Sequence, residues 1–160
     1  MGEKENYLAS RERELATTIN VLSAYPGAGE IRPAEKSKTA RELAWTFVAE
    51  EVLMQKLIDG KDLMSQGPKM DGSLADAIAM YKKISADMTK KIKGMSEKDF
   101  EKKVDFFVAP KKIGKERLGS LLWMFLMDQI HHRGQFSVYV RIAGGKLPSI
   151  YGPTADQPWT

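Results

Sequence analysis

Residues 128–135 place side chains capable of chemistry at helical spacing. Asp128 and His132 stand four residues apart, so on a helix their Cβ atoms lie roughly 5–6 Å from each other on one face. A carboxylate and an imidazole at that spacing can reach the same divalent metal ion, with water filling the remaining positions. A hydrogen bond between the two side chains, without a metal, is the simpler interpretation of this pair taken alone.

The same predicted helix face carries six residues at steps of three and four. This stripe consists of Leu121, Phe125, Asp128, His132, Gln135 and Tyr139. We expect the stripe to point into the core, where its polar groups need partners because unpartnered buried polar groups are costly. His131 lies off the stripe, and we expect it on the flank, with at most a weak role in moving protons.

A third metal ligand would have to come from a facing helix. Within residues 37–59, Glu50 is the one strong metal ligand on the apolar stripe, and Thr46 stands one turn earlier. We expect Glu51 on the flank. A solvated Glu50 is the alternative. The predicted metal ligands are therefore Asp128, His132 and Glu50.

Four helical patterns must position these residues. They cover about residues 5–24, from Ser37 or Thr39 to 59, 74–93 and 116–143, each ending near a proline or a glycine. Residues 104–108 are rich in β-branched and aromatic side chains and predict a short extended segment. We therefore predict an all-α fold, a four-helix bundle with long connections, as a single domain over residues 1–160.

Two further features concern packing. The segment 146–160 contains three prolines, so it cannot be one helix, but Ile150, Tyr151 and Trp159 predict an irregular C-terminal tail that packs back on the bundle. Gly134 interrupts a helix at a cost of about 1 kcal/mol, which predicts close approach of another helix or of the tail. Trp45 and Trp123 are expected in the core.

Composition limits the classes of function. The chain has 160 residues and no cysteine, which excludes disulfides, thiolate metal sites and a cysteine nucleophile. With two histidines in all, a three-histidine metal site is impossible. We find no apolar stretch long enough for a membrane span, no secretion signal and no nucleotide-binding motif, and expect a cytoplasmic protein. The net charge of +4 comes from mixed signs, which favours a solvated surface over a nucleic-acid interface.

Two segments resemble a known family. The run His131-His132-Arg133-Gly134-Gln135, together with residues 139–141 and 144–148, resembles the last core helix of the DinB/YfiT-like metalloenzymes. Residues 32–44 resemble the start of that family's second helix. The resemblance implies a four-helix bundle, often a homodimer, with a divalent metal ion such as nickel or zinc.

The resemblance also implies a ligand set. It aligns the family's pair of ligands, four residues apart, with Asp128 and His132, and it aligns the histidine of the second helix with Thr46. Threonine is a poor ligand. Glu50, one turn further along, is the replacement that we predict. A decayed site, in which Asp128 and His132 remain as a polar pair, is the alternative.

Two functions from different classes follow. In the first, the chain is a metal-dependent enzyme, and the resemblance implies thiol transfer or related transferase or hydrolase-like chemistry on a small thiol or another small molecule. In the second, the chain is a metal-free bundle that serves as a stress-response binding or dimerisation module. In that case the basic segment 111–115 would contact an acidic partner or nucleic acid.

Overall fold

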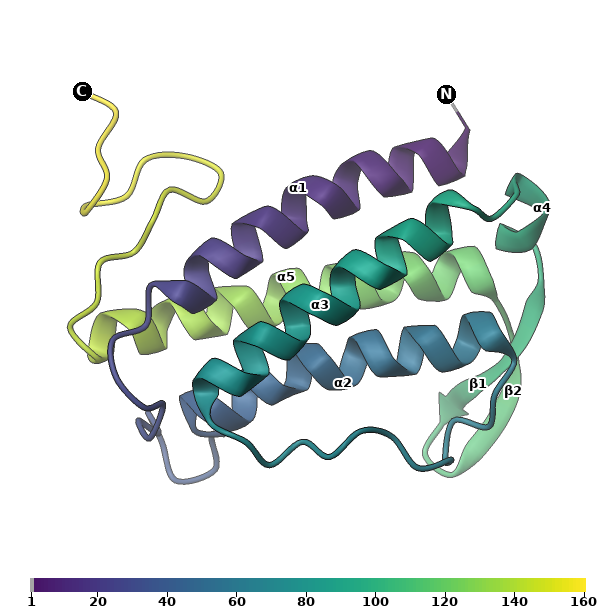
Figure 1. Ribbon diagram of the computed structural model, residues 1–160, viewed down its shortest axis with the longest axis horizontal. Helices are drawn as coiled ribbons and strands as arrows, with labels where there is room; N and C mark the ends of the chain where they lie inside the picture. The colour runs from purple at the N-terminus through teal and green to yellow at the C-terminus, as the bar shows by residue number, and fades with distance from the viewer. Residues whose placement is uncertain (1) are drawn as a thin grey trace.

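Four long helices form the bundle in the computed structural model, which describes residues 2–160 (Figure 1). They are α1 (Glu3–Ser23), α2 (Ala40–Asp59), α3 (Leu74–Lys93) and α5 (Leu118–Ile142). Helices α1 and α2 each pack against both α3 and α5. The predicted helical bundle with long connections is confirmed, and its helices lie within about three residues of the predicted bounds.

Helix α2 is fixed at both ends by local interactions. The Oγ1 atom of Thr39 accepts a hydrogen bond from the backbone N–H of Glu42, and the Glu42 carboxylate accepts one from the N–H of Thr39. This reciprocal pair satisfies two backbone donors that the first helical turn leaves free. Gly60 ends the helix in the left-handed conformation, with φ at 64°. Because both of its ends are fixed, α2 begins and ends at defined residues, and this determines which of its side chains lie near the middle of the bundle.

A small hairpin joins α3 to α5 and corrects one part of the prediction. After the short helix α4 (Glu97–Phe100), strand β1 (Lys103–Ala109) pairs antiparallel with β2 (Lys112–Arg117). The predicted extended segment 104–108 is therefore present, but its partner strand was missed. Residues 112–117 are mostly charged or glycine and lack an apolar alternation, so they carry little signal of a strand.

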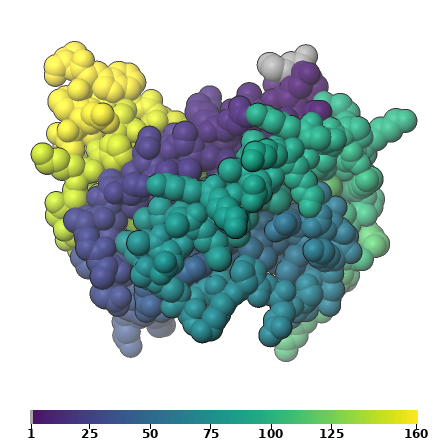
Figure 2. Space-filling model, in the orientation of Figure 1, coloured from purple at the N-terminus to yellow at the C-terminus, as the bar shows by residue number. Residues whose placement is uncertain are grey.

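The C-terminal tail packs on the bundle through its first half. Leu147 and Ile150 contact the core, and the hydroxyl of Tyr151 reaches α1 and α5. Trp159, by contrast, is 67% exposed, so the predicted packing is confirmed for residues near 147–151 and wrong for this tryptophan. Figures 1 and 2 show the tail as a separate lobe beside the end of α5.

The prediction that the two tryptophans lie in the core is confirmed in full for Trp45 only. The separate prediction that another segment approaches Gly134 closely is wrong for the described chain. Trp45 is buried, and Trp123 is partly buried against the core. A methyl group added at Gly134 would meet no atom of another segment of residues 2–160 within 4 Å, so no other part of the described chain approaches the helix there. None of the helices formed by these residues combines the length and apolar character needed to cross a membrane.

Candidate metal centre

The three predicted ligands meet between α2 and α5. Glu50, Asp128 and His132 each offer one ligand atom, and these atoms lie within 4.8 Å of one another. The Nε2 atom of His132 is 3.2 Å from Oε1 of Glu50 and 3.7 Å from Oδ2 of Asp128. Two carboxylates and an imidazole converge on one point, as a divalent metal site requires.

Glu50 is the buried member of this group. Its side chain is 7% exposed, and neither carboxylate oxygen makes a hydrogen bond with the described residues. Burial raises the pKa of Glu50 to about 7. Most buried polar atoms in folded proteins have a hydrogen-bond partner, so an orphaned carboxylate calls for an explanation. A bound cation supplies one, and the donor set around Glu50 fits a divalent metal ion.

His132 is oriented by a residue three positions further along α5. Its Nδ1 atom is 3.1 Å from Oε1 of Gln135, and an amide oxygen can only accept, so this contact places a proton on Nδ1. In the neutral ring, Nε2 then presents a lone pair to Glu50 and Asp128. The Glu50 carboxylate raises the pKa of His132, because it stabilises the protonated ring. Nε2 therefore needs either a second proton or a metal ion between itself and the carboxylates.

The predicted inward stripe is only partly correct. Leu121, Phe125 and Tyr139 are buried, but the Asp128 side chain is 48% exposed and Gln135 is exposed. Asp128 and His132 therefore lie at the edge of the interface between α2 and α5 rather than on the axis of the bundle. The consequence for a metal ion is that one side of the site is open to solvent.

Two polar residues of α5, Gln129 and Arg133, take the buried positions instead, and neither was predicted to do so. Gln129 donates to Oε1 of Glu51 at 3.0 Å and accepts from the hydroxyl of Tyr81 at 2.8 Å. Arg11 donates to Oε2 of Glu51 at 2.6 Å. The expectation that Glu51 lies on the flank is wrong, because this residue is fully buried at the centre of the bundle. The sequence of α2 alone carries little signal of this burial, because the partners of Glu51 come from α1 and α5.

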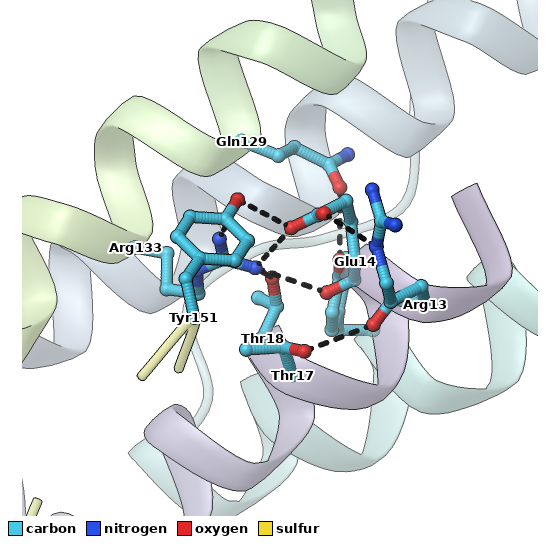
Figure 3. A network of polar contacts seen from close by, with 8 residues as sticks. Arg13, Glu14, Thr17, Thr18, Gln129, Arg133 and Tyr151 are labelled. Carbon is cyan, nitrogen blue, oxygen red and sulfur yellow. Dashed lines mark hydrogen bonds and ion pairs between the residues drawn. The ribbon is translucent and has the colours of Figure 1, made fainter. Parts of the chain in front are cut away.

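Arg133 fastens α5 to α1 beside the candidate centre. Its Nη1 atom donates to Oε2 of Glu14 at 2.8 Å, and its Nη2 atom donates to the hydroxyl of Tyr151 at 2.5 Å. The Tyr151 hydroxyl in turn donates to Glu14 at 2.7 Å (Figure 3). The tail thus closes a three-residue network next to His132, and this network fixes the rotation of α5 about its axis.

Thr46 does not join the candidate centre. Its hydroxyl donates to the backbone oxygen of Glu42, one turn earlier on α2, and accepts from Nζ of Lys38 at 2.6 Å. The family resemblance assigns a histidine ligand to position 46. In this protein the ammonium group of Lys38 lies next to that position instead.

A helical bundle with a carboxylate–imidazole cluster between two neighbouring helices is the class of protein that this geometry defines. The model of the DinB family matches residues 2–159. The chain therefore belongs to the DinB family, as the resemblance predicted.

The chain is also similar to known proteins in sequence and in fold. Over 39 residues the chain is 49% identical to the uncharacterised protein YrdA of Bacillus subtilis (strain 168), a stretch that covers 24% of this chain and 23% of YrdA. The fold is similar to that of a DinB-like protein from Bacillus cereus ATCC 10987, with a TM-score of 0.75 and 21% identity over 92% of this chain and 97% of the other. It is also similar to DinB-like YjoA from Bacillus subtilis, with a TM-score of 0.73 and 18% identity over 91% and 97%. At these identities the structural likeness concerns the fold alone.

Proposed function

We propose that the chain binds one divalent transition-metal ion through Glu50, Asp128 and His132 and acts as a metal-dependent enzyme on a small molecule. The observation that carries this proposal is the buried Glu50 carboxylate, which lacks a hydrogen-bond partner and faces Nε2 of His132 at 3.2 Å. Two carboxylates and one imidazole suit several divalent ions, and from the family resemblance we propose nickel or zinc. The predicted cytoplasmic location stays a prediction.

Each residue of the centre has a separate role in this proposal. Gln135 holds the His132 ring so that Nε2 faces the ion, which is the usual task of a residue behind a histidine ligand. Asp128 lies on the exposed side, where a substrate can enter. A bound metal ion would lower the pKa of a coordinated water or thiol, and from the family resemblance we propose thiol transfer as the reaction class.

Elemental analysis of protein made without an affinity tag tests the proposal. After removal of metals with a chelator and addition of zinc or nickel, we expect about one ion per chain after gel filtration. The variants Glu50→Gln, Asp128→Asn and His132→Ala should each lose most of the bound ion. The matched control is Asp87→Asn, an exposed acid on α3, which should keep it. Wild-type protein that elutes without metal, or variants that bind as well as wild type, would refute the proposal.

A second candidate function, the dimerisation module, is favoured by an exposed apolar row on α5. The row consists of Met124, Met127, Val138 and Ile142, and Gly134 lies within it. These positions fall on one helix face, and the missing side chain at Gly134 allows another helix to approach closely. We propose that a second copy of the chain covers this face. Under this candidate alone, the chain would bind no metal.

Sedimentation measurements test the homodimer. The wild type should sediment as a dimer, and Met127→Lys should be monomeric, because a charge would be buried in the apolar interface. Met64→Lys, which replaces an exposed methionine in the loop before α3, is the matched control and should leave the dimer intact. A wild-type monomer would contradict the dimer.

A further inference from the structure

A cavity opens beside the candidate metal centre. Its volume is about 470 Å³, within the range of sites that hold small molecules. Helix α5 forms one wall, and the segment before α2 forms the other. The lining of the cavity includes Lys36, Lys38, Leu43, His132, Gln135 and Val138.

The segment that carries the two lysines is held in place. The guanidinium of Arg32 donates to the backbone oxygen of Ser37 at 2.6 Å, and the hydroxyl of Tyr139 donates to the backbone oxygen of Lys38 at 2.8 Å. The first contact closes the loop on itself, and the second fastens it to α5. Lys38 is therefore presented to the cavity by a preformed loop, which lowers the entropy cost of binding a ligand there.

The two lysines have no carboxylate partner. Among residues 2–160, no Asp or Glu oxygen lies within 4 Å of Nζ of Lys36 or Lys38. Lys38 instead donates to the neutral hydroxyl of Thr46 at 2.6 Å. An ammonium group bonded to a hydroxyl keeps its full charge and has further N–H groups available. The cavity thus has an uncompensated positive side.

The cavity adjoins the two carboxylates of the candidate metal centre through His132. His132 lines the cavity, and it is in contact with Glu50 and Asp128. An anionic group on a ligand is attracted by Lys38 and repelled by the two carboxylates, so the charge pattern fixes the direction in which a ligand enters. Leu43 and Val138 give the lining of the cavity an apolar part.

We propose that this cavity binds a small organic molecule with one carboxylate group, which pairs with Lys38 and is assisted by Lys36. The apolar body of the molecule lies on Leu43 and Val138, and its far end points to His132. The inference rests on the proposed function only for what happens at that far end, because the pairing of a carboxylate with Lys38 needs no metal. A carboxylate suits the site better than a phosphate, since the lining includes two lysines and no arginine.

NMR titration of the metal-free and of the zinc-loaded full-length protein tests the proposal. The probes are phenylacetate, its neutral analogue phenylacetamide, and inorganic phosphate. Phenylacetate should shift the backbone signals of residues 36–38 and 138 and the side-chain amide of Gln135 in both forms. Phenylacetamide should bind about five- to tenfold more weakly, which corresponds to about 1–1.4 kcal/mol and is the usual net contribution of one hydrogen bond.

Variants identify the charge responsible. Lys38→Met should weaken phenylacetate binding about five- to tenfold and leave phenylacetamide binding unchanged, and Lys38→Arg should restore most of the affinity for phenylacetate. Lys82→Met, an exposed lysine of α3, is the control and should behave as wild type.

The outcomes separate this inference from the metal proposal. Phenylacetate binding that depends on Lys38 in a protein that takes up no zinc supports the inference and refutes the metal centre. Phenylacetate binding that requires zinc and ignores Lys38→Met overturns the inference, because the carboxylate would then be a metal ligand. Equal binding of phenylacetate and phenylacetamide, or tighter binding of phosphate, also overturns it.

Discussion

Glu50 and Glu51 are consecutive residues of α2 and both are buried, but only the Glu51 carboxylate accepts hydrogen bonds from the described residues. Glu51 faces the centre of the bundle, where Arg11 and Gln129 satisfy both of its oxygens. Glu50 faces α5 at His132 and is left without a donor. Adjacent residues of the same type thus have different surroundings: Glu51 is paired inside the bundle, and Glu50 is the residue that we propose as a metal ligand.

This difference predicts opposite effects on stability. Glu51→Gln should lower the free energy of unfolding of the metal-free protein by about 3–5 kcal/mol, because it leaves the buried Arg11 without its counter-charge. Glu50→Gln should change it by less than about 1 kcal/mol, because the contact with Nε2 of His132 lies at the solvent edge of the interface and the oxygen of an amide can keep it. Urea unfolding of both variants measures the two values. Equal losses would show that Glu50 also has a structural partner.

The Gln135 side chain should matter for metal affinity and little for stability. It is exposed, and its contact with Nδ1 of His132 orients the ring. Gln135→Ala should weaken zinc binding by about 10- to 100-fold, the usual cost of removing a residue behind a ligand. Competition with a chelating dye measures the affinity. Gln66→Ala, another exposed glutamine, should bind zinc as the wild type does, and a Gln135→Ala variant of unchanged affinity would contradict this role.

Thr46 offers a test of gained function. Thr46→His places an imidazole one turn before Glu50 on α2 and removes the hydrogen bond with Lys38. A fourth protein ligand, and the second imidazole, should tighten zinc binding at least about tenfold. The same dye competition applies, with Gln55→His on the exposed side of α2 as the control. An unchanged affinity would mean that position 46 cannot reach the ion.

Glu14 should make stability depend on acid pH. Burial acts to raise the pKa of Glu14, but the hydrogen bonds from Tyr151 and Arg133 outweigh it and hold this pKa below the ordinary value of 4.5. A carboxyl whose pKa is lower in the folded state contributes stability that is present above its unfolded pKa. That contribution disappears as the pH falls through the folded pKa.

Urea unfolding from neutral to acid pH checks this dependence. Glu14→Gln should unfold at lower urea than wild type near neutrality, and the gap should narrow in acid, where the wild-type carboxyl is protonated. Tyr151→Phe removes one of the hydrogen bonds and should cost about 1 kcal/mol at neutral pH. A gap between wild type and Glu14→Gln that does not depend on pH would contradict the titration of Glu14.

Gly134→Ala should stabilise the folded monomer. The added methyl group meets no atom of another segment of residues 2–160 within 4 Å, and alanine favours a helix over glycine by about 1 kcal/mol. Urea unfolding at low protein concentration, where a dimer would dissociate, measures this gain. A loss of stability under those conditions would reveal a packing constraint at this position.

Much of this protein follows from its sequence alone. Helical periodicity and the breakers around Gly60 and Pro26 determined four helices, because these signals are local and depend only on neighbouring residues. The spacing of Asp128 and His132 placed them on one face of α5, and Glu50 was identified as the acid on the facing stripe of α2. The structure brings these three together.

Only the tertiary structure decided which side chains are buried. Helix α5 contacts both α1 and α2, and is apolar on most of its surface, so its sequence contains no clear outward face. The packing turned Gln129 and Arg133 inward and left Asp128 at the edge. The packing also placed Glu51 in the core rather than on the flank of α2. Burial depends on how helices rotate against each other, and long-range pairs such as Arg11 with Glu51 and Glu14 with Arg133 fix that rotation.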